Sequence, residues 1–240
     1  MLKYEDLRRD RKRFLALTGI TPKEFEYLLP SFCRAYERLY TTSKTLSGKS
    51  RKRKAGGGRS SELKSNEQKL LFALVYQKAY PLQELLGAVF ELSQPQVNYW
   101  IHRLLPVLQD ALDYLGVIPE RDPSKFARHE RSKGETPELI IDGTERRRQR
   151  PKSPEKQVLH YSGKKKAHSD KNVVIVNAKT KRIGYLSATY AGKTHDKKIA
   201  TEEQMCYPRQ ATLYKDTGFQ GYEPRVAKTC QPKKSLVKES

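Results

Sequence analysis

The apolar residues in the first part of the chain recur at helical spacing. Thr21, Pro22 and Glu24 form a helix start, in which a capping side chain, a proline and a capping-box carboxylate follow one another. The apolar positions behind this start recur every three or four residues: Phe25, Leu28, Leu29 and Phe32. This pattern predicts a helical segment over residues 1–40.

Three more helices are predicted within residues 65–136, beginning near Ser65, Pro81 and Ser93. The apolar stripe of the second is Leu82, Leu85, Leu86, Val89 and Phe90. The stripe of the third is Val97, Trp100, Ile101, Leu104, Leu105 and Leu108. The second and third helices together have the form of a helix-turn-helix, and Trp100 is expected in its core.

After Pro137 the period changes from helical to extended. "ELII" predicts a buried strand, and "KNVVIVNAKTKRIGYLSATY" predicts two strands around an Ala-Lys-Thr-Lys turn. "HDKKIATEEQM" predicts a helix and "ATLYKD" a further strand. A helix between strands indicates a sheet with a parallel part. The predicted fold class is therefore α+β, an all-helical N-terminal domain followed by an α/β core in residues 137–240.

The net charge of the chain indicates what kind of partner it binds. Its 240 residues carry 48 Lys and Arg against 27 Asp and Glu, a formal net charge of +21. Such an excess repels itself unless an acidic partner offsets it, and nucleic acid is the polyanion that gains from releasing its counterions. No amphipathic helix rich in Trp, Phe and Lys and no long apolar run favours a membrane. We therefore expect a nucleic-acid partner, with no membrane and no small-molecule substrate.

Residues 41–64 are expected to form a basic flexible linker between the helical regions. The segment has three consecutive glycines and five basic residues between Lys49 and Lys54. The N-terminus is charged throughout and lacks the apolar core of a signal peptide. Cys33, Cys206 and Cys230 are widely spaced, as in free thiols of a reducing compartment. The expected location is the cytoplasm, in association with the nucleoid.

The third predicted helix carries polar residues suited to reading DNA. Opposite its apolar stripe the helix is expected to expose Gln94, Gln96, Asn98, Tyr99, His102 and Arg103. Gln and Asn can each form two hydrogen bonds with adenine. Two alternatives stay open, a three-helix bundle that binds no DNA and a merely surface-exposed His102. Glu91 also stands where turns of this type often carry glycine.

Two aspartates end predicted strands, and each is followed by glycine-rich sequence. Asp142 follows "ELII" and precedes Gly143, and Asp216 ends "ATLYKD" before "TGFQG". If the two strands pair in parallel, both carboxylates emerge together, where a hard cation such as Mg²⁺ or Mn²⁺ would offset their repulsion. The surrounding basic residues would then hold phosphates: Arg146, Arg147, Arg148, Lys164, Lys165 and Lys166. The alternative is that each aspartate only forms a turn.

The motifs of this region, taken in order, resemble one known family. "IDGTERRRQRP", "YSGKKKAH", "GKTHDKKIA", "LYKDTGFQGY" and "QPKK" resemble the DDE-type transposases of bacterial insertion sequences, in the Harbinger-like endonuclease group. The resemblance implies an RNase H-like core that cuts and joins double-stranded DNA at element ends, as a homo-oligomer on DNA. It implies that Asp142 and Asp216 are the first two catalytic acids. Asp196, after His195, is an accessory position and the main rival to Asp216.

The chain departs from this family at the third acid, a glutamate on a later helix. Glu223 lies too close to Asp216, and Glu239 is the penultimate residue. We therefore expect a C-terminally incomplete core that is inactive alone unless frameshifting extends it. The alternatives are a non-catalytic DNA-binding remnant, acting as a repressor or as a partner of full-length transposase, and a general RNA-binding protein.

Overall fold

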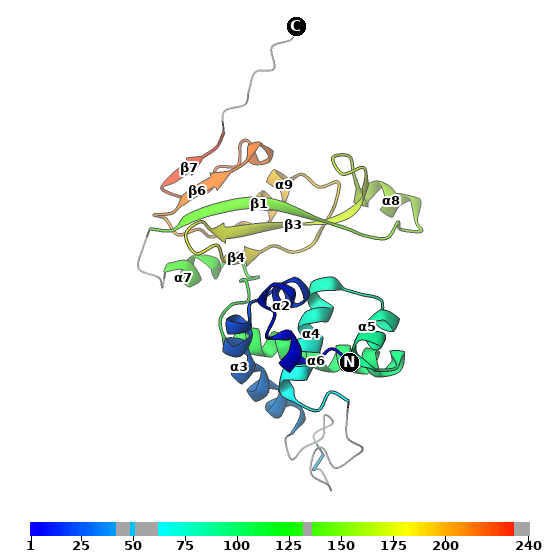
Figure 1. The fold of residues 1–240 in the computed structure, drawn as a ribbon. Coiled ribbons are helices and arrows are strands. Elements are labelled where there is room, and N and C mark those ends of the chain that lie inside the picture. The colour runs from blue at the N-terminus through cyan, green and yellow to red at the C-terminus, as the bar shows by residue number, and fades with distance from the viewer. Residues whose placement is uncertain (42–48, 51–61, 132–135, 233–240) are drawn as a thin grey trace. The chain divides into compact units, whose positions relative to one another are not determined.

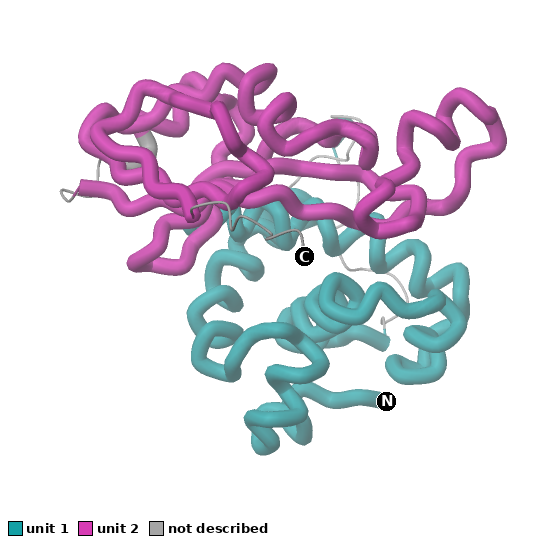
Figure 2. Tube along the Cα trace, turned by 90° about the horizontal axis from the view of Figure 1, so that it is seen from above, with its two compact units in different colours: residues 1–118 teal, residues 119–240 magenta. Residues whose placement is uncertain are grey.

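A computed structural model describes residues 1–41, 49–50, 62–131 and 136–232. Most of the expected linker, residues 42–48 and 51–61, therefore lies outside the described residues, as does Glu239. The chain forms two compact units, Met1–Ile118 and Pro119–Ser240, shown in different colours in Figure 2. Among the described residues, no helix has the length and apolar character needed to cross a membrane.

The first unit is all-helical. Its helices are α1 (Tyr4–Leu7), α2 (Arg11–Thr18), α3 (Pro22–Tyr40), α4 (Asn66–Ala79), α5 (Gln83–Phe90) and α6 (Gln94–Tyr114). The rings of Tyr4, Phe14 and Phe25 pack against one another at the centre of one part of its core, and Phe72 meets Phe90 in another. Leu63, within the expected linker, is fully buried in this core.

The predicted helix starts are confirmed at three places. The side chain of Thr21 caps α3 in a capping box with Glu24, Ser65 caps α4, and Ser93 forms a capping box at α6. The prediction for the first helix of the helix-turn-helix was wrong in part. α5 begins at Gln83, not at Pro81, and Leu82, Leu85 and Val89 of its stripe are exposed. Only Leu86 and Phe90 of that stripe are buried, because the face of α5 that packs on the core consists of Leu86, Gly87 and Phe90.

The second unit combines a sheet with short helices. Its helices are α7 (Phe126–Arg131), α8 (Pro154–His160) and α9 (Asp196–Glu202), with a 3₁₀ turn, η1 (Thr217–Phe219). Its strands are β1 (Glu138–Arg147), β2 (Tyr161–Ser162), β3 (Ala167–Asn177), β4 (Ile183–Leu186), β5 (Tyr190–Ala191), β6 (Thr212–Lys215) and β7 (Lys228–Cys230). Together the two units give the α+β organisation that the sequence predicted.

The sheet is mixed, and β1 lies at its centre (Figure 1). Its main path runs β2-β3-β1-β6-β7, while β4 and β5 also pair with β3. β1 and β3 are antiparallel, whereas β1, β6 and β7 run parallel, as the helix before "ATLYKD" indicated. The buried face of the sheet packs on Ile199 and Ala200 of α9, with Tyr185 and Phe219 in the same core.

The predicted end of β1 at Asp142 was wrong. The strand continues to Arg147 because Gly143 and Thr144 stay paired with Val173 and Asn172 of β3. Gly143 therefore makes no turn here. Its lack of a side chain instead allows Asp196 to lie close to the strand, since an added Cβ would lie 2.6 Å from Oδ1 of Asp196.

Candidate functional site

Asp142 and Asp216 are brought together by the parallel pairing of β1 and β6. The last paired positions are Ile141 and Lys215, so the two aspartates are the next residues on each strand. Because β6 ends there, β1 has no parallel neighbour at Asp142 and beyond. Side chains alternate along a strand, so Asp142 shares a face with Ile140, opposite the core face of Leu139 and Ile141.

The two aspartates line one groove on this face, with a volume of about 660 Å³. Both side chains are exposed, and each accepts a backbone hydrogen bond: Gly143 N–H to Asp142 Oδ1 at 2.7 Å, and Gly218 N–H to Asp216 Oδ1 at 2.9 Å. Neither carboxylate forms an ion pair with a described lysine or arginine. The groove thus offers two carboxylates whose charge the described residues do not neutralise.

This donor set fits a hard divalent cation, which prefers carboxylate oxygens and keeps several waters. Within the described part of the chain, however, no group of three or more His, Cys, Asp or Glu is arranged to hold a metal. Cys230, Gln231 and Tyr214 also line the groove. The side-chain amide of Gln231 donates to the backbone carbonyl of Asp216 at 2.6 Å, which ties the segment after β7 to the candidate site.

On the opposite face of the sheet, a buried lysine joins two more carboxylates. Lys171 Nζ lies 3.3 Å from Oε1 of Glu145 and 3.1 Å from Oδ1 of Asp196, and it donates to the carbonyl of Thr194 at 2.9 Å. Lys171 and Glu145 are each 9% exposed at the side chain. Burial alone would raise the pKa of Glu145, but hydrogen bonds from Ser162, Lys171 and Ser169 hold that pKa below its ordinary value.

Asp196 lies close to the candidate catalytic pair. It is the first residue of α9 and packs against the backbone of Gly143, next to Asp142. A Cβ on Gly218 would lie 3.0 Å from Oδ1 of Asp216 and 3.3 Å from Oδ2 of Asp196, so the two carboxylates flank this glycine. His195 is exposed beside them. Asp196 is thus held by Lys171, whereas Asp142 and Asp216 face the open groove.

The predicted phosphate-binding residues divide into two groups. Lys164, Lys165 and Lys166 are exposed in the turn between β2 and β3, and Arg147 is exposed at the end of β1. Arg146 and Arg148 are instead engaged within the protein. Arg146 donates to Oδ1 of Asn172 at 2.7 Å. Arg148 forms an ion pair with Asp170 at 2.8 Å and also meets His160.

The helix-turn-helix places most of the predicted base-reading side chains on α6. Gln94, Gln96, Tyr99 and His102 are exposed, and Asn98 is half-buried. The side chain of Gln96 accepts from the backbone N–H of Ser93 at 2.8 Å, which leaves its NH₂ group to donate elsewhere. Glu91 adopts the left-handed conformation with φ of 55°, the position for which glycine is common.

Arg103 is not exposed as the helical pattern predicted. Its guanidinium lies 3.6 Å from the ring centre of Tyr40 and 5.7 Å from that of Tyr99, and its Nε is buried without a hydrogen-bond partner. The pattern of α6 alone could not show this, because Tyr40 comes from α3. Trp100 lies in the core as predicted, with 7% exposure.

Glu223 links two strands of the second unit. Its carboxylate accepts from Lys215 Nζ at 2.6 Å and from Thr229 Oγ1 at 3.2 Å, so it connects β6 to β7. The Lys215 hydrogen bond holds the pKa of Glu223 below its ordinary value. Sequence reasoning missed the roles of Glu145, Lys171 and Lys215. A charged residue inside a strand pattern is the one local signal of such buried pairs, and their partners are distant in sequence.

Comparison with known families agrees with both units. Residues 141–239 match the family model of the DDE superfamily endonuclease, and residues 61–113 match that of the helix-turn-helix of DDE superfamily endonuclease. The chain therefore carries a DDE superfamily endonuclease domain, with the helix-turn-helix of that superfamily placed before it. No curated protein and no solved structure matches the chain.

Proposed function

We propose that this chain binds double-stranded DNA through its helix-turn-helix and cuts a phosphodiester bond at Asp142 and Asp216. The observation that carries the proposal is the β1–β6 register, which makes two unpaired carboxylates neighbours in one groove. In finer detail, the substrate is the terminal repeats of an insertion sequence, and cleavage is followed by strand transfer into target DNA. The protein acts as a homo-oligomer on DNA, with an RNase H-like core.

Endonucleases of this superfamily use divalent metals, and Asp142 and Asp216 would hold such an ion, Mg²⁺ or Mn²⁺. When bound, the cation supplies Lewis-acid activation of the scissile phosphate and of a water. The backbone N–H groups of Gly143 and Gly218 orient the two carboxylates. The free lysines of the β2–β3 turn bind the phosphates of the DNA backbone and so position the strand.

Substitution of Asp142 tests the proposal. Asp142→Asn keeps the shape of the side chain but removes its charge, so nicking of a supercoiled plasmid in Mn²⁺ should fall at least a hundredfold while duplex affinity stays within about twofold. Glu155→Gln removes one carboxylate from the exposed surface of α8, outside the groove, and serves as the matched control. Equal nicking by Asp142→Asn and the parent would refute the assigned site.

A non-catalytic DNA-binding protein, acting as a repressor or as a partner of a full transposase, is the second candidate. It is favoured because the groove contains no third carboxylate among the described residues. The same experiment separates the two functions. Tight duplex binding by the parent protein without metal-dependent nicking would support the second candidate.

A further inference from the structure

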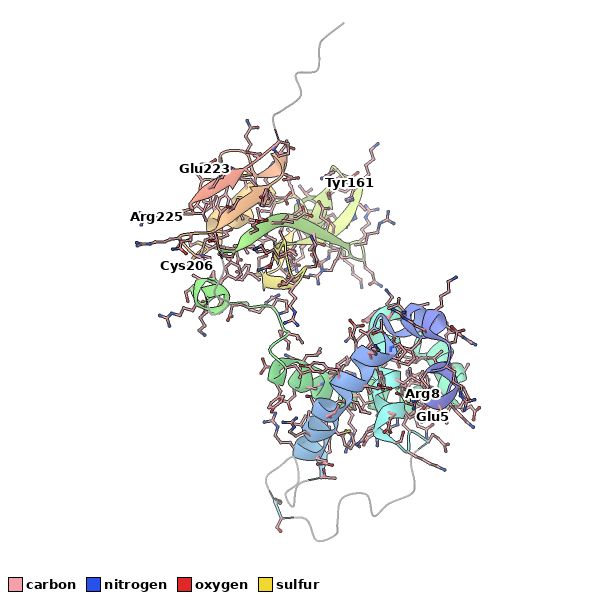
Figure 3. All side chains as sticks on the ribbon, turned by 60° about the vertical axis from the view of Figure 1, so that its left-hand side comes forward. Glu5, Arg8, Tyr161, Cys206, Glu223 and Arg225 are labelled. Carbon is pink, nitrogen blue, oxygen red and sulfur yellow. The ribbon has the colours of Figure 1, made fainter. Side chains whose placement is uncertain are left out.

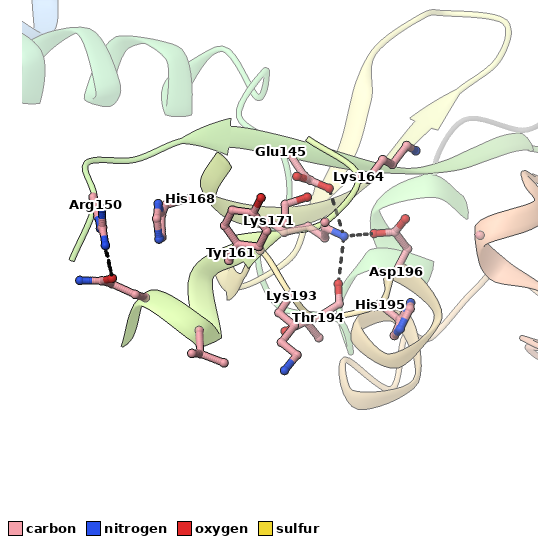
Figure 4. Close-up of a pocket in the computed structure, with 16 residues that line it drawn as sticks. Glu145, Arg150, Tyr161, Lys164, His168, Lys171, Lys193, Thr194, His195 and Asp196 are labelled. Atoms are coloured by element: carbon pink, nitrogen blue, oxygen red, sulfur yellow. Dashed lines mark hydrogen bonds and ion pairs between the residues drawn. The ribbon is translucent and has the colours of Figure 1, made fainter. Parts of the chain in front are cut away.

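A pocket of about 980 Å³ opens on the sheet face opposite the Asp142 groove. It runs between α8, the β2–β3 turn and the loop before α9 (Figure 4). Gly218 and Asp196 close one end, and an added Cβ on Gly218 would lie 3.0 Å from Oδ1 of Asp216. The pocket therefore begins beside a carboxylate of the candidate active site. From there the pocket extends toward α8, which packs against β3 as α9 does.

The floor of the pocket is polar and ordered. Glu145, Lys171 and Asp196 form the charged network described above, and the dashed lines in Figure 4 mark its contacts. Lys171 Nζ donates to the carbonyl of Thr194 and lies within ion-pair distance of Glu145 and Asp196, yet Oδ1 of Asp196 is buried without a hydrogen-bond partner. With two carboxylates against one ammonium, this floor disfavours an anionic group and suits a ligand that presents hydrogen-bond donors.

The entrance carries the opposite charge. Lys164 and Lys193 line it on different sides of the charged floor (Figure 4), and neither forms an ion pair with a described residue. Arg150 stands at the far end, where its guanidinium donates to Oε1 of Gln157 at 2.9 and 3.1 Å and so keeps its full charge. Cations at the entrance above an acidic floor fit a ligand with an anionic end and a neutral polar end.

One wall is aromatic. Tyr161 is 45% exposed and pairs across the β2–β3 ladder with His168, whose ring meets it edge-on at 5.7 Å. This edge contact fixes the tyrosine ring while its exposed side remains open. Figure 3 places Tyr161 and Glu223 at opposite ends of the second unit, so this wall lies far from the β6–β7 connection. An exposed, fixed ring is a surface on which a flat base can stack.

We infer that this pocket binds one unpaired nucleotide of the DNA substrate, next to the bond cut at Asp142 and Asp216. The inference rests on the proposed function. The phosphate of the nucleotide lies on Lys193, its base stacks on Tyr161, and the polar edge of the base meets the floor. A paired base cannot reach the floor of a pocket, so the nucleotide must leave the helical stack.

The test uses the full chain in EDTA, so that binding is measured without cleavage. Two short duplexes of the same sequence are compared, one blunt and one ending in a single unpaired 2-aminopurine nucleotide. We expect the parent to bind the second about tenfold more tightly, with a fall in 2-aminopurine emission as the base stacks. Tyr161→Ala should bring the ratio of the two affinities to about one and abolish the emission change.

Tyr27→Ala, at an exposed tyrosine in the first unit, is the matched control and should keep both signals. If Tyr161→Ala fails to fold, Lys193→Ala is compared with Lys156→Ala, which removes a charge from α8 outside the pocket. Lys193→Ala should lower the preference and Lys156→Ala should keep it. Equal affinity of the parent for both duplexes would overturn the inference alone. Absence of binding to either duplex would overturn the proposed function as well.

Discussion

At the scale of single residues, the candidate site depends on Gly143, because its lack of a side chain leaves room for the carboxylate of Asp196. Gly143 continues β1 without a turn, and Asp196 occupies the space a Cβ would fill. Lys171 in turn holds Asp196 at 3.1 Å. Because the Asp196 side chain is short and held by Lys171, it has little freedom to move aside. The contact between α9 and β1 therefore depends on Gly143.

Gly143→Ala should therefore destabilise the second unit by about 1–3 kcal/mol, the usual cost of inserting a methyl group into a packed position. The single tryptophan, Trp100, lies in the first unit and reports on that unit alone. We expect the part of the urea transition that tyrosine fluorescence alone reports to move to lower urea concentration, and the transition followed by Trp100 fluorescence to stay in place.

Gly163→Ala is the matched control for this prediction, because an added Cβ there meets nothing within 4 Å. Its unfolding transitions should coincide with those of the parent. A Gly143→Ala protein as stable as Gly163→Ala would mean that Asp196 does not rest against β1.

Residue-level chemistry could be predicted from sequence where the signal is local. The capping residues Thr21 and Ser93 were recognisable because each cap and its partner lie three residues apart. The pairing of Lys171 with Glu145 and Asp196 was not, because these residues come from β3, β1 and α9. For the same reason Arg103 appeared free on α6, although Tyr40 of α3 covers it.

At the scale of elements, Gln96 at the start of α6 has two roles, one in capping the helix and one in binding DNA, and one substitution can separate them. The carbonyl oxygen of the Gln96 side chain completes the capping box, and its NH₂ group is the proposed donor to a base. A glutamate at this position keeps the cap, since Glu serves equally at the third residue of a capping box. It cannot donate, and its charge repels phosphate.

Gln96→Glu should thus leave the thermal stability of the first unit unchanged while weakening duplex binding about tenfold or more, the value of one good base contact. Gln109→Glu adds the same charge to an exposed position further along α6 and should change affinity little. Fluorescence anisotropy with labelled duplex measures both. Equal weakening by the two variants would show that charge alone acts and that Gln96 reads no base.

At the scale of the whole molecule, the α+β class, a sheet with a parallel part and the helix-turn-helix followed from hydrophobic periodicity, whereas the parallel pairing of β1 with β6 entered only as a condition. The continuation of β1 past Asp142 did not, because Asp-Gly is typical of a turn and only the partner strand β3 keeps it extended. The short strands β2, β5 and β7 carry too few residues for a periodic signal. Yet β2 and the β2–β3 turn frame the pocket, so its existence depends on pairing that no local pattern specifies.

The net charge of +21 predicts strongly salt-dependent DNA binding, and the β2–β3 turn should account for part of it. Each phosphate neutralised contributes about 0.9 to the slope of log affinity against log salt. Replacing Lys164, Lys165 and Lys166 together by alanine should therefore lower the slope by about 2–3. Replacing the exposed Arg9, Arg11 and Lys12 removes the same total charge from the first unit and is the control. If both triple variants lower the slope equally, the net charge of the chain acts without regard to place, and the turn makes no specific phosphate contacts.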